Sequence, residues 1–294
     1  MQMFEKMSYF AYLVGWKFVG ALPEKLAYGL FGFLGRYFYS KNGKSVRRLR
    51  RNLSIVSPHL NDEELESLTS DAFASYMRYW CDTFRIHKWS HERIERTVTT
   101  RNDHLLRDPM KEGRGVVIAL PHSGNWDHAG AYFCQQGINL VTVAEVLKPE
   151  ALFKKFLDYR VKMGFEVLPL DSRAFVTLIK RAREKRLIAL VADRDLSSSG
   201  IEVDFFGHKA KMPGGPALLA LREGLPLVVA HVSYTEIGIH IDFQEIELSN
   251  AHSDEIRLQE TVQKMATAFE VGIRTHLVDW HMLQRIWIEE GIYS

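Results

Sequence analysis

The chain has 294 residues, of which 46% are hydrophobic and 25% are charged, and its formal net charge is +2. These values exclude an intrinsically disordered protein and are typical of one large α/β domain or two small ones. So small a net charge does not point to a nucleic-acid partner. Cys81 and Cys134 lack the spacing of a disulfide framework or a zinc site and suggest a reducing compartment.

The first predicted elements are helices in an apolar N-terminal region. Lys17, Glu24, Lys25 and Arg36 interrupt this region, so no stretch reaches the roughly 20 apolar residues of a membrane-spanning helix. The region also lacks the pattern of a secretory signal, in which basic residues precede the apolar stretch and a small-x-small cleavage site follows it. We therefore expect the protein to stay in the cytoplasm.

A helix predicted within residues 26–38 carries its large apolar side chains on one face. These side chains are Leu26, Leu30, Phe33, Leu34, Tyr37 and Phe38. Between Lys41 and Arg51, six basic residues and no acidic one follow. An apolar face beside such cations fits the surface of an anionic membrane; the alternative is a buried helix followed by a solvated basic segment. We expect residues 1–52 to comprise interfacial helices and this basic cluster, in one unit with an α/β domain over residues 53–294.

After a helix predicted over residues 61–89, with Asn61 as its N-cap, the hydrophobic pattern changes to short apolar runs. Strands are predicted at residues 116–120, 140–143, 165–170, 187–192, 225–232 and 240–248. Helices are predicted at residues 150–163, 173–186, 215–223 and 255–276. Strands that alternate with helices of this length indicate an α/β fold, with a mainly parallel central sheet flanked by helices.

The residues most informative about chemistry follow the strand at 116–120, at the end where open α/β sheets place their ligands. They read Pro121-His122-Ser123-Gly124-Asn125-Trp126-Asp127-His128. The Asp127 carboxylate can fold back to His122 and accept a hydrogen bond from one ring nitrogen, while the other nitrogen takes a proton from a hydroxyl. Two alternatives remain open: Asp127 caps a helix beside a structural histidine, or His122, Asp127 and His128 bind a metal, although their spacing matches no usual zinc pair.

A second charged cluster, Asp193-Arg194-Asp195, follows the strand at 187–192. Charges that leave a buried strand must pair with each other or lie in a solvated cleft, where Arg194 can bind an anion such as a phosphate. A polar turn, a segment that begins at Glu202, and a helix start rich in small residues come next. The free N–H groups of that helix start could also meet an anion.

Several segments resemble a known family. The pattern His-x-x-x-x-Asp resembles the glycerolipid acyltransferase superfamily, and HSGNWD, ADRDLSSSGIEVDFFG, MPGGPALLA and DWHMLQRIW resemble its bacterial lipid A biosynthesis acyltransferase-like branch. Within that branch they are most similar to the phosphatidylinositol mannoside acyltransferases of actinobacterial envelopes, over about residues 8–290. Lipid A enzymes usually carry Glu where this chain has Asp127, and this departure favours the mannoside group.

The resemblance implies that His122 is the general base, which draws the proton from a mannose hydroxyl as this attacks an acyl thioester. It also implies a further carboxylate beside His122; Glu202, Asp193 and Asp195 are candidates, and we favour Glu202. The residues expected to contact substrate are Asn125, Arg160, Asp193, Arg194 and Asp195, with Arg160 near the acyl donor. No covalent acyl-enzyme is expected, because no Ser or Cys lies in a nucleophile elbow next to a base.

The reaction implied is transfer of a fatty acyl group from acyl-CoA to a mannose hydroxyl of a phosphatidylinositol mannoside, with no metal and no cofactor besides the acyl-CoA substrate. The implied location is peripheral, on the anionic cytoplasmic face of the plasma membrane. The alternatives are a lipid A-type acyltransferase that uses acyl carrier protein, a thioesterase in which water replaces the sugar, and a non-catalytic membrane-bound scaffold.

Overall fold

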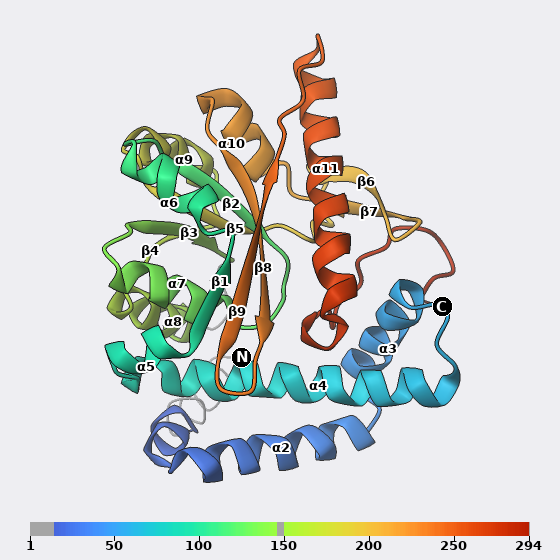
Figure 1. The fold of residues 1–294 in the computed structure, drawn as a ribbon. Coiled ribbons are helices and arrows are strands. Elements are labelled where there is room, and N and C mark those ends of the chain that lie inside the picture. The colour runs from blue at the N-terminus through green and yellow to red at the C-terminus, as the bar shows by residue number, and fades with distance from the viewer. Residues whose placement is uncertain (1–14, 146–149, 294) are drawn as a thin grey trace.

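A seven-stranded sheet forms the centre of the computed structural model, which describes residues 15–145 and 150–293 (Figure 1). The strands are Val98–Arg101 (β1), Val116–Leu120 (β2), Leu140–Ala144 (β3), Glu166–Pro169 (β4), Leu187–Val191 (β5), Leu227–Tyr234 (β8) and Ile239–Ile246 (β9). Their order in the sheet is β1-β9-β8-β2-β5-β3-β4. Neighbours are parallel except β8 and β9, which form an antiparallel hairpin. The predicted α/β fold with a mainly parallel sheet is therefore confirmed.

Helices cover both faces of this sheet. The helices of the described residues are Glu24–Ser40 (α2), Lys44–Val56 (α3), Asp62–Arg85 (α4), His91–Arg96 (α5), His104–Lys111 (α6), Trp126–Gln135 (α7), Glu150–Lys162 (α8), Ala174–Arg183 (α9), Gly215–Glu223 (α10) and Asp254–Thr275 (α11), with short 3-10 turns at Ile86–Lys88 and Leu277–Asp279. On β2, Val117 and Ala119 belong to the core shared with α9, α10 and α11, whereas Ile118 and Leu120 belong to the core shared with α6, α7 and α8. A strand covered on both faces is apolar at every position, which is why β2 reads as an unbroken apolar run.

Helix α4 crosses the sheet at the end where the β8–β9 hairpin turns (Figure 1). The predicted Asn61 cap is present as a capping box with Glu64: the Asn61 side chain accepts from the backbone N–H of Glu64, and the Glu64 side chain accepts from that of Asn61. Because β8 runs parallel to β2 and β5, α4 lies at the carboxyl end of these strands. The helix thereby closes one side of the region that holds the histidine motif.

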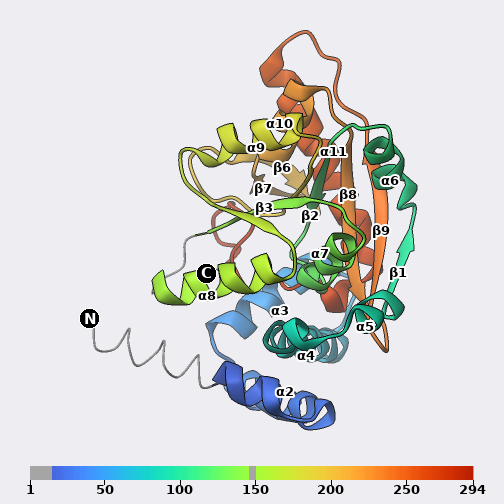
Figure 2. The same cartoon turned by 90° about the vertical axis from the view of Figure 1, so that its left-hand side faces the viewer.

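Helix α2 lies on the outer side of α4, away from the sheet, in both side views (Figures 1 and 2). Its small residues Ala27 and Gly35 are buried together with Phe31, whereas Leu26 and Phe33 are 60% and 59% exposed. Much of the apolar face predicted for this helix therefore points outward. Within residues 15–145 and 150–293, no helix is both long enough and apolar enough to cross a bilayer.

The basic segment after α2 is a helix that the sequence analysis did not predict. Most of it lies within α3, where Val46, Leu49, Leu53 and Val56 are buried at helical spacing. The basic residues between these apolar positions obscured the helical period in the sequence. The apolar residues before position 15, which are part of the predicted interfacial region, lie outside the described residues, and the division at residue 52 stays a prediction.

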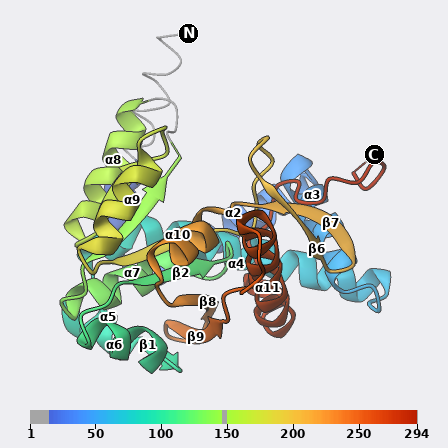
Figure 3. The same cartoon turned by 90° about the horizontal axis from the view of Figure 1, so that it is seen from above.

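A two-stranded antiparallel hairpin, Ile201–Phe205 (β6) and His208–Met212 (β7), lies apart from the main sheet. Seen from above, this hairpin lies beside α11, near α3 and the C-terminal segment, and α8 and α9 lie at the other end of the molecule (Figure 3). The sequence analysis predicted neither strand of the hairpin. It also missed β1, a four-residue strand at the edge of the main sheet.

Candidate active site

The histidine motif forms a tight turn at the carboxyl end of β2. Gly124 has φ +56°, and a side chain there would place its Cβ only 2.6 Å from the carbonyl oxygen of Val232 in β8. Glycine meets both demands, because it adopts positive φ without strain and has no Cβ. The Ser123 hydroxyl donates to the same Val232 oxygen (2.5 Å). The turn is thus seated directly on the neighbouring strand, and His122 follows the strand end by two residues.

His122 and Asp193 meet because they follow adjacent parallel strands. β2 pairs with β5 in a register that places Leu120 opposite Val191, and the Ala192 N–H donates to the Leu120 oxygen (2.9 Å). Asp193 Oδ1 lies 2.6 Å from His122 Nδ1, and its Oδ2 accepts from the His122 backbone N–H (3.0 Å). The Asp193 side chain is 0% exposed. Asp193, one of the three carboxylates considered, is therefore the one that orients His122.

The free nitrogen of His122 is available to a substrate. The His122 side chain is 39% exposed, and none of the described residues hydrogen-bonds to its Nε2. Burial of the ring lowers the pKa of His122, but the charge of Asp193 and the hydrogen bond to it raise the pKa more, so that it lies above its ordinary value. A carboxylate that accepts from Nδ1–H fixes the tautomer in which Nε2 is a proton acceptor. This arrangement has the geometry of a general base.

The prediction that Asp127 orients His122 is wrong. Asp127 lies in the first turn of α7, and its carboxylate accepts from Arg160 Nε (2.8 Å) and, at 3.4 Å, from the Tyr79 hydroxyl. The carboxylate is 2% exposed, and a buried charge needs such a partner. The Asp127 carboxylate raises the pKa of Arg160 against the opposing effect of burial, which is the larger single influence. The acid of the motif therefore joins α7 to α8 and leaves orientation of the imidazole to Asp193.

Asn125, expected to contact substrate, is instead a fully buried helix cap. Its side-chain oxygen accepts from the His128 N–H (3.0 Å), and its Nδ2 donates to Asp82 Oδ2 (3.3 Å). Asn125 and not Asp127 is thus the N-cap of α7. The Asn125 amide is therefore not free to bind substrate, because its oxygen and its nitrogen both have hydrogen-bond partners in the interior.

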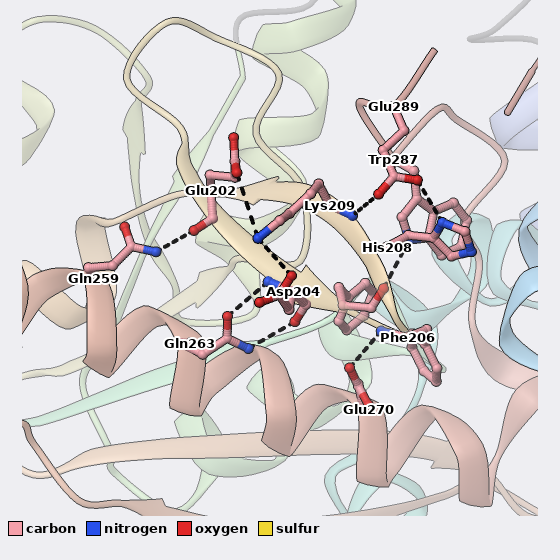
Figure 4. Close-up of polar contacts among 11 residues, drawn as sticks. Glu202, Asp204, Phe206, His208, Lys209, Gln259, Gln263, Glu270, Trp287 and Glu289 are labelled. Carbon is pink, nitrogen blue, oxygen red and sulfur yellow. Dashed lines mark hydrogen bonds and ion pairs between the residues drawn. The ribbon is translucent and has the colours of Figure 1, made fainter. Parts of the chain in front are cut away.

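Glu202, the carboxylate favoured for His122, lies on the β6–β7 hairpin, and this prediction is also wrong. Its side chain is 52% exposed, and its carboxylate lies 3.9 Å from Lys209 Nζ on β7 (Figure 4). The hairpin is attached to α11 through paired backbone–side-chain bonds between Asp204 and Gln263 (2.8 Å each). Sequence proximity to the DRD cluster suggested Glu202, but the turn at residues 197–200 carries the chain away before Glu202 is reached.

The other two residues of the DRD cluster are held by main-chain groups. Arg194 Nε donates to the Arg285 carbonyl oxygen (2.8 Å), and Asp195 Oδ1 accepts from the Ser197 N–H (2.8 Å). Asp195 forms no hydrogen bond with His122. Contacts of Arg194 and Asp195 with substrate stay predictions. Among residues 15–145 and 150–293, no group of three His, Cys, Asp or Glu side chains is placed to hold a metal ion.

An apolar cavity lies between the sheet and α7, on the face shared with α6 and α8. Its volume is about 80 Å³, smaller than that of a typical ligand pocket. Its lining includes Leu120 and Val191 at the ends of β2 and β5, and Trp126, whose ring centroid lies 5.7 Å from that of His122. Asp127 and Arg160 supply polar groups in an otherwise mostly apolar lining. The cavity therefore begins beside the His122–Asp193 pair.

A C-terminal segment that the sequence analysis gave no role completes the site. The His122 oxygen accepts from the His281 N–H (2.8 Å), and the Gly124 N–H donates to the Asp279 oxygen (2.9 Å). The indole Nε1–H of Trp280 donates to Asp193 Oδ2 (3.1 Å). The sequence contained a signal, because these residues belong to the DWHMLQRIW motif, but pairing across some 150 residues cannot be inferred from local patterns.

Known proteins are similar to this chain over nearly its whole length, including the residues of this site. The family model described as bacterial lipid A biosynthesis acyltransferase matches residues 1–289. A phosphatidylinositol mannoside acyltransferase of Mycolicibacterium smegmatis is 40% identical over 283 residues, which cover 95% of this chain and 91% of that protein. A protein of the same name from Mycobacterium tuberculosis strain H37Rv is 39% identical, with 95% and 88% covered. A lipid A biosynthesis acyltransferase of Haemophilus influenzae is 20% identical, with 66% and 61% covered.

Proposed function

The chain belongs to the bacterial lipid A biosynthesis acyltransferase family, and from that premise we propose that it moves a fatty acyl group from acyl-CoA to a mannose hydroxyl of a phosphatidylinositol mannoside. The observation that carries the proposal is the His122–Asp193 pair at the end of an apolar cavity. The acceptor is proposed from the names of relatives that are 39–40% identical over 95% of the chain. The relative named for lipid A synthesis is only 20% identical.

In the proposed reaction His122 acts first as a general base and then as a general acid. Nε2 takes the proton of the mannose hydroxyl while its oxygen attacks the thioester carbonyl carbon. The resulting imidazolium, stabilised by Asp193, returns the proton to the departing coenzyme A sulfur as the C–S bond breaks. An ester and a free thiol leave, and His122 is neutral again. The carboxylate does not need to take the proton, because its charge and orientation suffice.

The apolar lining of the cavity supports a fatty acyl donor. Each buried methylene of the acyl chain contributes about 0.8 kcal/mol, and the lining of the cavity is mostly apolar. Arg160 is in the lining, where the family resemblance places a donor-site arginine. The donor test presents the purified protein with acyl-CoA and with acyl carrier protein bearing the same chain. We expect transfer from acyl-CoA and not from the acyl carrier protein. Transfer only from the carrier protein would contradict this part of the proposal.

The acceptor test measures products by mass spectrometry after incubation with acyl-CoA. A phosphatidylinositol mannoside should gain one acyl group, and a lipid A precursor should not. Release of free fatty acid at full rate without any acceptor would instead identify a thioesterase. Loss of all acyl transfer in His122→Ala, with the fold intact, would separate an enzyme from a scaffold that keeps only the shape.

We also propose that α2 rests on the cytoplasmic membrane surface. Leu26, Phe33 and Phe38 are 60%, 59% and 49% exposed on this helix, and Lys41 and Lys44 follow it with exposed side chains. Exposed apolar groups beside cations fit an anionic bilayer, where each basic residue contributes about 1 kcal/mol.

Sedimentation with vesicles that contain anionic phospholipid tests this location. Replacement of Leu26, Phe33 and Phe38 by serine should shift the protein to the supernatant. The matched control replaces Val176 and Ile256, which are 69% and 50% exposed on α9 and α11, and should leave binding unchanged. Equal loss in both variants, or in neither, would contradict a membrane contact through α2.

A further inference from the structure

Trp280 is the largest fully buried side chain that touches the catalytic pair. It is 0% exposed and packs against Phe206 and Trp287 with ring centroids 6.3 Å apart in each case. Packing alone needs no indole N–H, and phenylalanine or leucine could fill a core position. Yet the N–H points at a carboxylate, since Nε1 lies 3.1 Å from Asp193 Oδ2.

The two oxygens of Asp193 have different partners. Oδ1 faces His122 Nδ1 at 2.6 Å, and Oδ2 accepts from the His122 backbone N–H and from the Trp280 indole. The two donors on Oδ2 fix the rotation of the carboxylate about its Cβ–Cγ bond. With that rotation fixed, Oδ1 stays in line with the imidazole.

The backbone of Trp280 is held as firmly as its ring. Ser123 and Trp280 form an isolated antiparallel bridge, flanked by the bonds from His281 N–H to the His122 oxygen and from Gly124 N–H to the Asp279 oxygen. Asp279 is anchored in turn by the Ser75 hydroxyl on α4 (2.7 Å) and by the Tyr234 N–H on β8 (2.7 Å). The indole is therefore attached to the same turn that carries His122.

We propose that Trp280 is a positioning residue for acyl transfer, which acts through Asp193 by holding its carboxylate in the orientation that His122 needs. The inference rests on the proposed function, because it assigns Trp280 a role in that reaction. A hydrogen bond to a charged group corresponds to about a 10- to 100-fold effect. The effect should fall on kcat and leave the KM for the acyl donor unchanged, because Trp280 is not among the residues that line the cavity and is fully buried.

The kinetic test is Trp280→Phe, which removes the N–H and keeps an aromatic ring. We expect kcat to fall about 10- to 100-fold. The rising limb of the pH profile should move to higher pH, because a carboxylate with one donor fewer stabilises the imidazolium more. A merely structural tryptophan would lower the melting temperature and leave the pH profile in place. A limb that stays in place, or moves to lower pH, would overturn the proposal.

The matched control is Trp287→Phe. Trp287 is also buried in the C-terminal segment and also donates through its indole, but to the Phe205 carbonyl oxygen on β6 (3.1 Å; Figure 4). It should match Trp280→Phe in loss of stability and not in loss of kcat. In the Asp193→Asn background, Trp280→Phe should cost less than twofold. The same loss in both backgrounds would show that Trp280 does not act through Asp193.

A spectroscopic measurement covers the case in which Trp280→Phe does not fold, and it needs no activity. The chain has six tryptophans, so protein labelled with ¹⁵N in its indoles gives six Nε1–H signals. One of them should lie downfield because of this hydrogen bond, and it should move upfield in Asp193→Asn, because a neutral amide oxygen accepts a weaker hydrogen bond than a carboxylate; the control Asp195→Asn should leave it in place. If no indole signal responds to Asp193→Asn, the bond is absent and the proposal fails. If the signal responds but acyl transfer to the mannoside is never found, the contact stands and the proposed function fails.

Discussion

Replacement of Asp193 by asparagine should inactivate the protein, because the contacts of this side chain would then hold His122 in the wrong tautomer. Two N–H groups, from the His122 backbone and the Trp280 indole, point at Oδ2. They require an acceptor, so the asparagine oxygen takes this position and its NH₂ group occupies the position of Oδ1. The NH₂ group then donates to Nδ1, which forces the ring proton onto Nε2. An imidazole protonated at Nε2 cannot take a proton from a sugar hydroxyl.

A wrong tautomer of this kind costs about 10⁴-fold in rate in the best-studied case of a histidine–aspartate pair, and we expect a loss of about 10³- to 10⁴-fold in kcat for Asp193→Asn. Activity in the unmodified protein should rise with pH through a His122 pKa above about 6.5, because Asp193 raises that pKa and only the neutral ring is a base. In Asp193→Asn the residual activity should titrate at lower pH, since the charge that stabilised the imidazolium is gone.

The assay is acyl transfer from acyl-CoA to a phosphatidylinositol mannoside, measured by mass spectrometry between about pH 5 and 9. Glu202→Gln is the control, since the Glu202 carboxylate lies beside Lys209 on the β6–β7 hairpin, away from His122. It should keep kcat within about twofold. A rate for Asp193→Asn within tenfold of the unmodified protein, or an unmoved pH limb, would refute the assignment of Asp193 as the partner of His122.

Three further substitutions test the corrected roles. Arg160→Met should destabilise the fold by about 3–5 kcal/mol in denaturant unfolding, because it leaves the buried Asp127 charge unpaired; a cost below about 1 kcal/mol would show that the pair is not needed. Asn125→Ala should lower stability by about 1 kcal/mol through loss of the α7 cap without a change in the KM for either substrate, and a rise in KM would restore a substrate contact. Glu202→Gln should leave kcat within about twofold, and a loss of a hundredfold would show that Glu202 reaches the site.

The sheet could be predicted because its signal is local. The runs at Val116–Leu120 and Leu187–Val191 are apolar at nearly every position, as strands covered on both faces must be. Strand β1, with only Val98 buried, and the hairpin β6–β7, where buried and exposed residues mix, gave no such run. Helix α3 was hidden because five arginines and lysines share its thirteen residues with the buried apolar stripe.

The place of His122 at a candidate site could be predicted, but its partner could not. His122 lies at a strand end followed by glycine, a local pattern. The pairing with Asp193 depends on β5 being the neighbour of β2, although β3 and β4 intervene in the sequence. Sequence spacing favoured Asp127, five residues away, which the fold uses for Arg160. The contact between Trp280 and Asp193 could not be predicted for the same reason, since it joins residues 87 positions apart.

The single-turnover rate of His122→Ala with acyl-CoA and a purified phosphatidylinositol mannoside decides whether Nε2 of His122 is the general base for acyl transfer. The acylated lipid is quantified by mass spectrometry, and Glu202→Gln from the same preparation serves as the reference. We expect a rate about 10²- to 10⁴-fold lower in His122→Ala, with the fold retained. A rate within tenfold of that of Glu202→Gln would contradict this role of His122.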